Sequence, residues 1–231
     1  MFYRYVGLQG GGLLRDKELK MQSLFTSQEL VKLNLPGADV RYQEHLEFGR
    51  SAGEIFDDLV RQISWKHEDI TIHGKTFKQP RLTAWYGDPG MSYTYSGLSL
   101  APLAWPALLL ELKRKVEEVT QQTYNSALLN QYRGHRDSVG FHADDEPELG
   151  RNPTIASLSF GETREFVLKP KRGRPGQTTR LPLASGSLLV MAGETQQNWL
   201  HGVEKLNAPC GGRVNITFRN IVGQRRGRFA R

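Results

Sequence analysis

The sequence contains a single cysteine, Cys210, and it has no long uninterrupted hydrophobic run. One thiol excludes an intrachain disulfide and any zinc site built from several cysteines. The chain therefore does not depend on an oxidising compartment. The most apolar stretch, residues 98–110, is interrupted by Pro102 and Pro106 and is too short to cross a bilayer. These absences predict a cytoplasmic protein with no membrane partner.

Positive charge exceeds negative charge, and the excess is concentrated in two short segments. Lys and Arg number 31 against 24 Asp and Glu, which gives a formal net charge of +7. Residues 169–180 hold five basic residues and residues 223–231 hold four, and neither segment contains an acid. Without these nine residues the chain would carry 22 basic and 24 acidic residues. The pattern favours a polyanionic partner such as nucleic acid, and the alternative is a solvated loop with a solvated tail.

Local patterns predict many short strands and few helices. The 24 glycines and 11 prolines favour turns over a helix bundle. Apolar residues at helical spacing predict helices over 51–63 and 106–122, and a His-Gly turn predicts a hairpin over 70–77. Strands are predicted at 91–95, 127–132, 155–160, 165–169, 187–191 and 213–221. This order is typical of a mainly β protein with flanking helices (α+β), built as an antiparallel sandwich or jelly roll.

The length of 231 residues suits one domain, or one domain with an elaborated edge. Residues 1–20 precede a second plausible start at Met21, so we interpret them as an extension or tag outside the fold. We expect residues 21–120 to hold the helices and hairpins, and residues 121–222 to hold the sheet core. Residues 223–231 would form a basic tail.

Residues 213–219 alternate strictly between polar and apolar types. Arg213, Asn215, Thr217 and Arg219 share one face of the predicted strand, and three apolar residues share the other. A strand on the protein surface alternates in the same way. If the polar face instead lines a small barrel, its two arginines suit a dicarboxylate, because guanidinium groups form paired hydrogen bonds with carboxylates.

A second pattern carries possible metal ligands. His142 and Asp144 are two residues apart, so on an extended chain their side chains point the same way. His201 follows a later predicted strand. Two histidines and one carboxylate on one face of Fe(II) leave open positions, as in non-haem oxygenases. The spacing alone is a weak signal, and the alternative is a turn with His201 at a strand end.

Taken in order, the motifs resemble the AlkB family of Fe(II)/2-oxoglutarate dioxygenases over about residues 80–222. They are 130–132 (Asn-Gln-Tyr), 142–146 (His-Ala-Asp-Asp-Glu), 156–161 (Ala-Ser-Leu-Ser-Phe-Gly), 181–189, 199–201 (Trp-Leu-His) and 213–219. The similarity is greatest to members that repair alkylated DNA. It implies a double-stranded β-helix, the cupin-like jelly-roll core of that class.

The resemblance also implies roles for individual residues. The iron ligands would be His142, Asp144 and His201. Arg213 matches the arginine that pairs with the distal carboxylate of 2-oxoglutarate, and Arg219 matches a second arginine near the iron and the proximal carboxylate. The remaining co-substrate positions are Asn130, Tyr132 and Thr217.

The substrate residues follow from the same resemblance. Hairpins within residues 21–120 would recognise the nucleotide: Tyr93 and Tyr95 align with aromatics around a flipped-out base, Glu146 with an acid near the lesion, and Arg81 with an arginine on the DNA side. His73 lies at or near the hairpin tip where duplex-acting members carry a bulky apolar residue. Because imidazole is a poorer wedge, we expect single strands to be handled at least as well as duplexes. Lys171, Arg172 and Arg174 are the expected contacts to the nucleic-acid backbone.

The implied activity is oxidative demethylation of N-alkylated bases in DNA, of the 1-methyladenine and 3-methylcytosine type. Formaldehyde is released, and 2-oxoglutarate is decarboxylated to succinate and CO2. The implied cofactors are Fe(II), 2-oxoglutarate and O2, and the expected state is a monomer acting on single- or double-stranded DNA. The alternatives are the same chemistry on RNA, protein or lipid, or a non-catalytic nucleic-acid-binding module.

Overall fold

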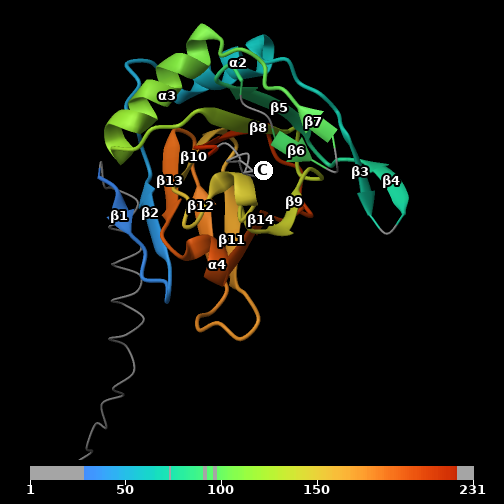
Figure 1. The fold of residues 1–231 in the computed structure, drawn as a ribbon. Helices are drawn as coiled ribbons and strands as arrows, with labels where there is room; N and C mark the ends of the chain where they lie inside the picture. The colour runs from blue at the N-terminus through green and yellow to red at the C-terminus, as the bar shows by residue number, and fades with distance from the viewer. Residues whose placement is uncertain (1–28, 73, 91–92, 96–97, 223–231) are drawn as a thin grey trace, which may run out of the picture.

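The computed structural model describes residues 29–72, 74–90, 93–95 and 98–222. Two antiparallel sheets face each other (Figure 1). The larger has the strand order β1 (Val31–Lys32), β2 (Asp39–Gln43), β13 (Ser187–Ala192), β10 (Ile155–Gly161), β15 (Arg213–Arg219), β8 (Ser126–Tyr132) and β5 (Leu82–Gly87). The smaller has the order β12 (Thr179–Leu183), β11 (Arg164–Pro170), β14 (Trp199–Val203) and β9 (Val139–His142).

Smaller elements complete the described fold. Two hairpins lie outside the main sheets: β3 (Asp69–Ile72) with β4 (Lys75–Lys78), and β6 (Tyr93–Tyr95) with β7 (Leu98–Leu100). A 3-10 turn, η1 (Pro147–Leu149), follows β9, and a short helix, α4 (Thr195–Asn198), connects β13 to β14.

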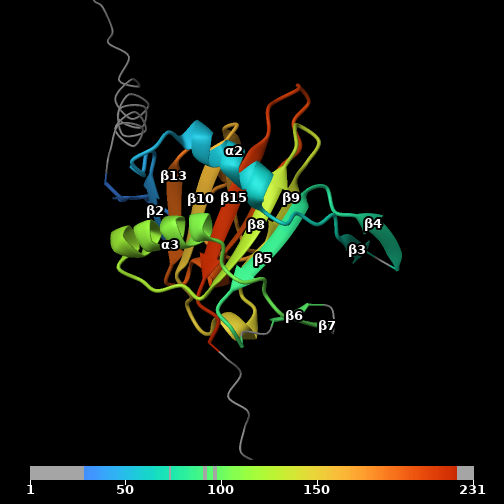
Figure 2. The ribbon, with the colours of Figure 1, turned by 90° about the horizontal axis from the view of Figure 1, so that it is seen from above.

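Two helices cover the outer face of the larger sheet, α2 (Ala52–Gln62) and α3 (Ala107–Thr120) (Figure 2). Both helices confirm the sequence predictions over 51–63 and 106–122. At the start of α2, Ser51 Oγ accepts a hydrogen bond of 3.2 Å from Glu54 N, and Ser51 N donates to Glu54 Oε2 at 2.9 Å. These two hydrogen bonds satisfy the backbone N–H groups of Ser51 and Glu54, and they fix where the helix begins.

Alternation along the central strands separates two apolar cores. On β13, Leu188 and Val190 pack with the helices, whereas Leu189 and Met191 pack with residues of the smaller sheet. On β15 the apolar face also joins the helix side, through residues such as Ile216. The polar face of β15 therefore points between the two sheets, as the inside-of-barrel interpretation of this strand requires.

The mainly β class with flanking helices is confirmed, but the larger sheet is not confined to residues 121–222. Three strands from before residue 121, β1, β2 and β5, belong to it. The strands predicted at 127–132, 155–160, 165–169 and 187–191 are confirmed within one residue at each end, and the last strand ends at Arg219 rather than at 221. Among the described residues, no helix has the length and apolar character needed to span a bilayer.

Candidate active site

Three potential metal ligands come together between the two sheets. His142 ends β9 and is the register partner of His201 on β14. Asp144 lies two residues beyond β9. The ligand atoms of these three side chains all lie within 4.8 Å of one another. Asp144 Oδ2 is 3.7 Å from His201 Nε2, and Asp144 Oδ1 is 4.0 Å from His142 Nε2.

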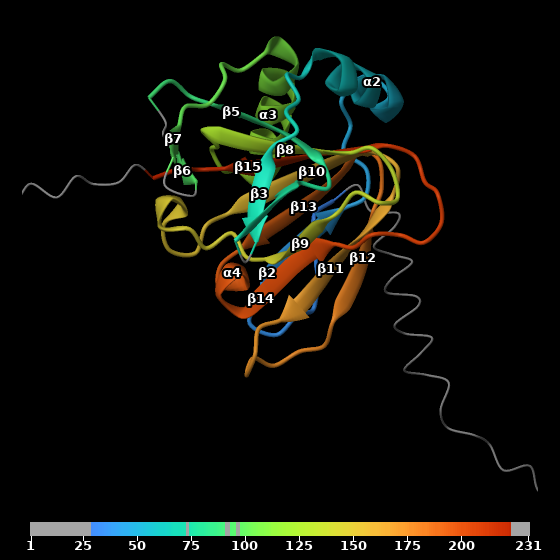
Figure 3. The ribbon, with the colours of Figure 1, turned by 90° about the vertical axis from the view of Figure 1, so that its right-hand side faces the viewer.

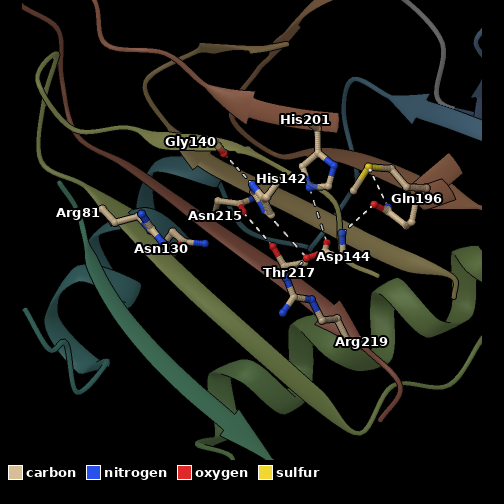
Figure 4. A network of polar contacts seen from close by, with 11 residues as sticks. Arg81, Asn130, Gly140, His142, Asp144, Gln196, His201, Asn215, Thr217 and Arg219 are labelled. Carbon is tan, nitrogen blue, oxygen red and sulfur yellow. Dashed lines mark hydrogen bonds and ion pairs between the residues drawn. The ribbon is translucent and has the colours of Figure 1, made fainter. Parts of the chain in front are cut away.

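Neighbouring groups orient both imidazoles (Figure 4). The Nδ1 atom of His142 lies 2.8 Å from the carbonyl oxygen of Gly140, to which it must donate. The Nε2 atom of His142 therefore faces Asp144. The ring of His201 stacks on Phe166, with ring centroids 5.2 Å apart. A hydrogen bond from the far nitrogen of a ligand histidine is the usual way in which a metal site fixes its tautomer.

The electrostatics of the cluster keep its ligands in metal-binding form. Burial lowers the pKa of His201 to about 4, so its imidazole is neutral at neutral pH. Burial alone would raise the pKa of Asp144, but Arg219, aided by the two histidines, holds it below its ordinary value. Arg219 Nη2 donates to Asp144 Oδ1 at 2.5 Å. The site therefore offers one carboxylate and neutral imidazole nitrogen, which is what a divalent ion requires.

Arg213 supplies a buried positive charge to the same pocket. Its side chain is 1% exposed, and its Nη2 donates to Ser159 Oγ at 2.9 Å. Its Nε and Nη1 atoms are buried and have no hydrogen-bond partner among the described residues. Its guanidinium carbon lies 5.1 Å from the ring centroid of Tyr132. A buried guanidinium with two unused donors is suited to a carboxylate ligand.

Hydrogen bonds between side chains hold the other polar residues of the pocket in place. Asn215 Nδ2 donates to Ser157 Oγ at 2.8 Å, and Asn215 Oδ1 accepts from Thr217 Oγ1 at 3.1 Å. Arg81 Nε donates to Asn130 Oδ1 at 2.7 Å. These contacts fix the directions of the side chains that line the pocket.

Most predicted site residues line this single pocket. They are Arg81, Asn130, Tyr132, His142, Asp144, His201, Arg213, Thr217 and Arg219. Arg81 lines the pocket and hydrogen-bonds to Asn130, and its expected role on the DNA side stays a prediction. Among the described residues Glu146, Lys171, Arg172 and Arg174 do not line it. His73 and the side chains of Tyr93 and Tyr95 lie outside what the structure describes.

Three further residues of the site had no role assigned from the sequence: Ser157 lines the pocket, and Ser159 and Gln196 hydrogen-bond to residues that line it. Ser157 and Ser159 alternate with apolar residues on β10, and this alternation is the signal that places them on the inner face with Arg213. Gln196 accepts a hydrogen bond from the backbone of Asp144 at 3.0 Å. Its partner is 52 residues away in the chain, so no local pattern reveals it.

The residues present fit a divalent iron with a dicarboxylate beside it. Two imidazoles and one carboxylate are the donor set that non-haem Fe(II) takes in oxygenases. The unused donors of Arg213 fit a carboxylate in the same pocket.

Comparison with known proteins agrees with this geometry. The family model described as the 2OG-Fe(II) oxygenase superfamily matches residues 41–219, which includes the three candidate metal ligands and the three arginines that line the pocket. The chain belongs to this superfamily. Within it the chain is AlkB-like: it is 40% identical over 185 residues to the human "DNA oxidative demethylase ALKBH2", covering 76% of this chain and 71% of that protein.

Two further similarities were found for this AlkB-like chain. It is 44% identical over 186 residues to "Alpha-ketoglutarate-dependent dioxygenase alkB homolog 3" of Bos taurus, covering 77% of this chain. It spans only 64% of that relative's length. The solved structure of OsALKBH1 matches with a TM-score of 0.54 at 18% identity, over 83% of this chain and 99% of the other. At that identity the match supports the fold alone.

Proposed function

We propose that this AlkB-like chain demethylates N-alkylated nucleobases by Fe(II)- and 2-oxoglutarate-dependent oxidation. One observation carries the proposal: a His-Asp-His cluster and a buried guanidinium with unused donors line the same pocket. Similarity to relatives named as a DNA oxidative demethylase and a 2-oxoglutarate dioxygenase supports the substrate class.

The chain's own residues would divide the work as follows. His142, Asp144 and His201 hold the iron, and Arg213 and Arg219 bind and orient the dicarboxylate. When bound, iron, O2 and 2-oxoglutarate supply the oxidising power that converts an N-methyl group to N-hydroxymethyl, from which formaldehyde leaves, as 2-oxoglutarate becomes succinate and CO2.

The exposure of the ligands indicates from which side the substrate would enter. The side chain of His142 is 40% exposed, whereas that of Asp144 is 2% exposed. Apolar side chains, among them Phe166 and Met191, line the pocket together with the ligands. The methyl group would therefore reach the iron past His142, and the apolar wall would exclude water from the deeper part of the pocket.

The loop between β11 and β12 supports a polyanionic substrate. Arg172 and Arg174 are exposed and form no ion pair within the described part of the chain. The loop starts at a fixed point, because Lys171 N donates to Asn198 O at 2.8 Å and Lys171 Nζ lies 3.0 Å from Asp145 Oδ2. Asp145 follows a metal ligand, so the basic loop begins beside the proposed active site. Contacts from such arginines to phosphates would position any sequence in the same way.

The hairpin β3–β4 offers a second surface for the substrate. It projects from the body of the molecule (Figures 1 and 2), and Phe77 on β4 is 51% exposed. We propose that this hairpin contacts bases next to the lesion. The preference for single strands, which was inferred from His73, stays a prediction.

The test is a turnover assay with methylated oligonucleotides. The protein is incubated with Fe(II), 2-oxoglutarate and O2, and with single-stranded DNA, duplex DNA or RNA that carries one 1-methyladenine or 3-methylcytosine. Loss of the methyl group is read by mass, and succinate is measured in parallel. We expect the demethylated base and succinate in equal amounts with at least one nucleic acid. The His201→Ala variant should form neither.

The same assay separates the alternatives. Succinate without methyl loss from any oligonucleotide would show uncoupled oxidation of 2-oxoglutarate, and the substrate would then not be one of these nucleic acids. Salt-dependent oligonucleotide binding without succinate would indicate a non-catalytic binding module. Either result would contradict the proposal.

A further inference from the structure

The short helix α4 is fixed to the segment that precedes and begins β2. Thr195 Oγ1 accepts a hydrogen bond of 3.0 Å from the backbone N–H of Asp39. Asn198 Nδ2 and Trp199 Nε1 donate to backbone carbonyls at Gly37 and Pro36, at 2.7 and 3.0 Å. Figure 3 shows α4 beside β14, which carries His201. These three hydrogen bonds therefore hold α4 in one position relative to the larger sheet.

Gln196, on the same helix, points toward the metal site (Figure 4). Its side chain is 2% exposed. Its Oε1 accepts a hydrogen bond of 3.0 Å from Asp144 N, and its Nε2 lies 3.6 Å from Met191 Sδ. Asp144 comes after the last residue of β9, so the strand ladder does not fix its backbone.

We propose that Gln196 is a positioning residue of the metal site. Its oxygen holds the backbone of Asp144, and Arg219 holds the carboxylate of the same residue. Gln196 also lies five residues before His201, so it joins the two chain segments that carry the ligands. The anchored helix thereby sets the separation between the Asp144 carboxylate and the His201 imidazole. The inference rests on the proposed function, because it takes these side chains as metal ligands.

The test replaces Gln196 by Met, which has a similar length and volume but is apolar and has no acceptor oxygen. Gln197→Met is the matched control, since Gln197 is the next residue of the same helix but is exposed and bonds Asn152. Co(II) is the probe, because it reports ligand geometry by its absorption spectrum without supporting turnover. Affinity, spectrum and the metal-free unfolding midpoint are measured for each protein.

The expected result is a Co(II) affinity weaker by about 10- to 100-fold in Gln196→Met, the usual range when a group that orients a metal ligand is lost. Its Co(II) spectrum should change, and Gln197→Met should match the wild type in both respects. If Gln196→Met does not fold, Gln196→Asn, whose shorter side chain withdraws the oxygen, is measured with the same expectations.

Two other results have distinct meanings. A variant at position 196 that unfolds more easily but binds Co(II) with wild-type affinity and spectrum would overturn the inference, because the residue would then serve the fold alone. Wild-type protein that does not bind Co(II) would overturn the proposed function, and with it the basis of the inference.

Discussion

Replacing Arg213 by Met should separate co-substrate binding from the stability of the fold. The Arg213 guanidinium is buried, and burial lowers the pKa of this group, so its charged form is disfavoured in the free protein. Its Nη2 donates to Ser159 Oγ and it lies against Tyr132, and no carboxylate forms a salt bridge with it within the described part of the chain. Methionine would fill a similar volume without a charge. We expect the free protein to keep or gain stability, because removing a buried charge that lacks a partner removes its desolvation cost.

The affinity for 2-oxoglutarate should change in the opposite direction. Loss of one partner of a buried, hydrogen-bonded charge pair costs about 2–5 kcal/mol. At about 1.4 kcal/mol for each tenfold step, affinity should fall by about 30- to 4000-fold. Calorimetric titration with 2-oxoglutarate in the presence of Mn(II) measures the affinity without turnover, and urea unfolding measures the stability.

Arg180 provides the control, because it is exposed and pairs with Glu165 and Glu204 at 2.9 Å. Arg180→Met should leave the affinity for 2-oxoglutarate unchanged. The assignment of Arg213 would be refuted if Arg213→Met bound 2-oxoglutarate within about twofold of the wild type, since that difference is only about 0.4 kcal/mol.

Three further outcomes are expected. His142→Ala should release no succinate while keeping the wild-type circular dichroism spectrum, and succinate at the wild-type rate would contradict the ligand assignment. Replacing Arg172 and Arg174 together by Ala should weaken binding to all DNA sequences similarly and reduce the log–log salt slope by about 2 units, whereas an unchanged slope would mean that the loop touches no phosphate. Burial raises the pKa of Tyr124 to about 12, against an ordinary value of 10.0, so stability should fall between these pH values as the unfolded phenol ionises first. Urea unfolding of Tyr124→Phe should lack this part of the alkaline decline, and an identical decline in both proteins would refute it.

Elements with a strong local signal were predictable from the sequence. The Ser51–Glu54 pair marked the start of α2, and the alternation at residues 213–219 marked both the strand and its polar inner face. The three candidate metal ligands and the arginines expected to bind 2-oxoglutarate followed from the family resemblance, and these residues converge in the structure.

Other elements take their conformation from distant parts of the chain. The strands β9 and β14 were not predicted, because each is short, contains a glycine and a histidine, and becomes a strand by pairing with its neighbours. The strand β2 pairs with β13, almost 150 residues later, and no local pattern indicates that partner. The contact between Gln196 and Asp144 is hidden for the same reason.

The anchoring of α4 bears on where a minimal catalytic fragment can begin. The region matched to the oxygenase family starts at residue 41, which makes that position a natural choice for truncation. A fragment cut there would lose the backbone groups at Pro36, Gly37 and Asp39 that hold α4, and the first residues of β2. It would retain every residue that lines the pocket, but it would lose the hydrogen bonds that fix α4, the helix that precedes His201. The smallest piece of this chain able to keep its metal site in shape therefore reaches back at least to residue 36.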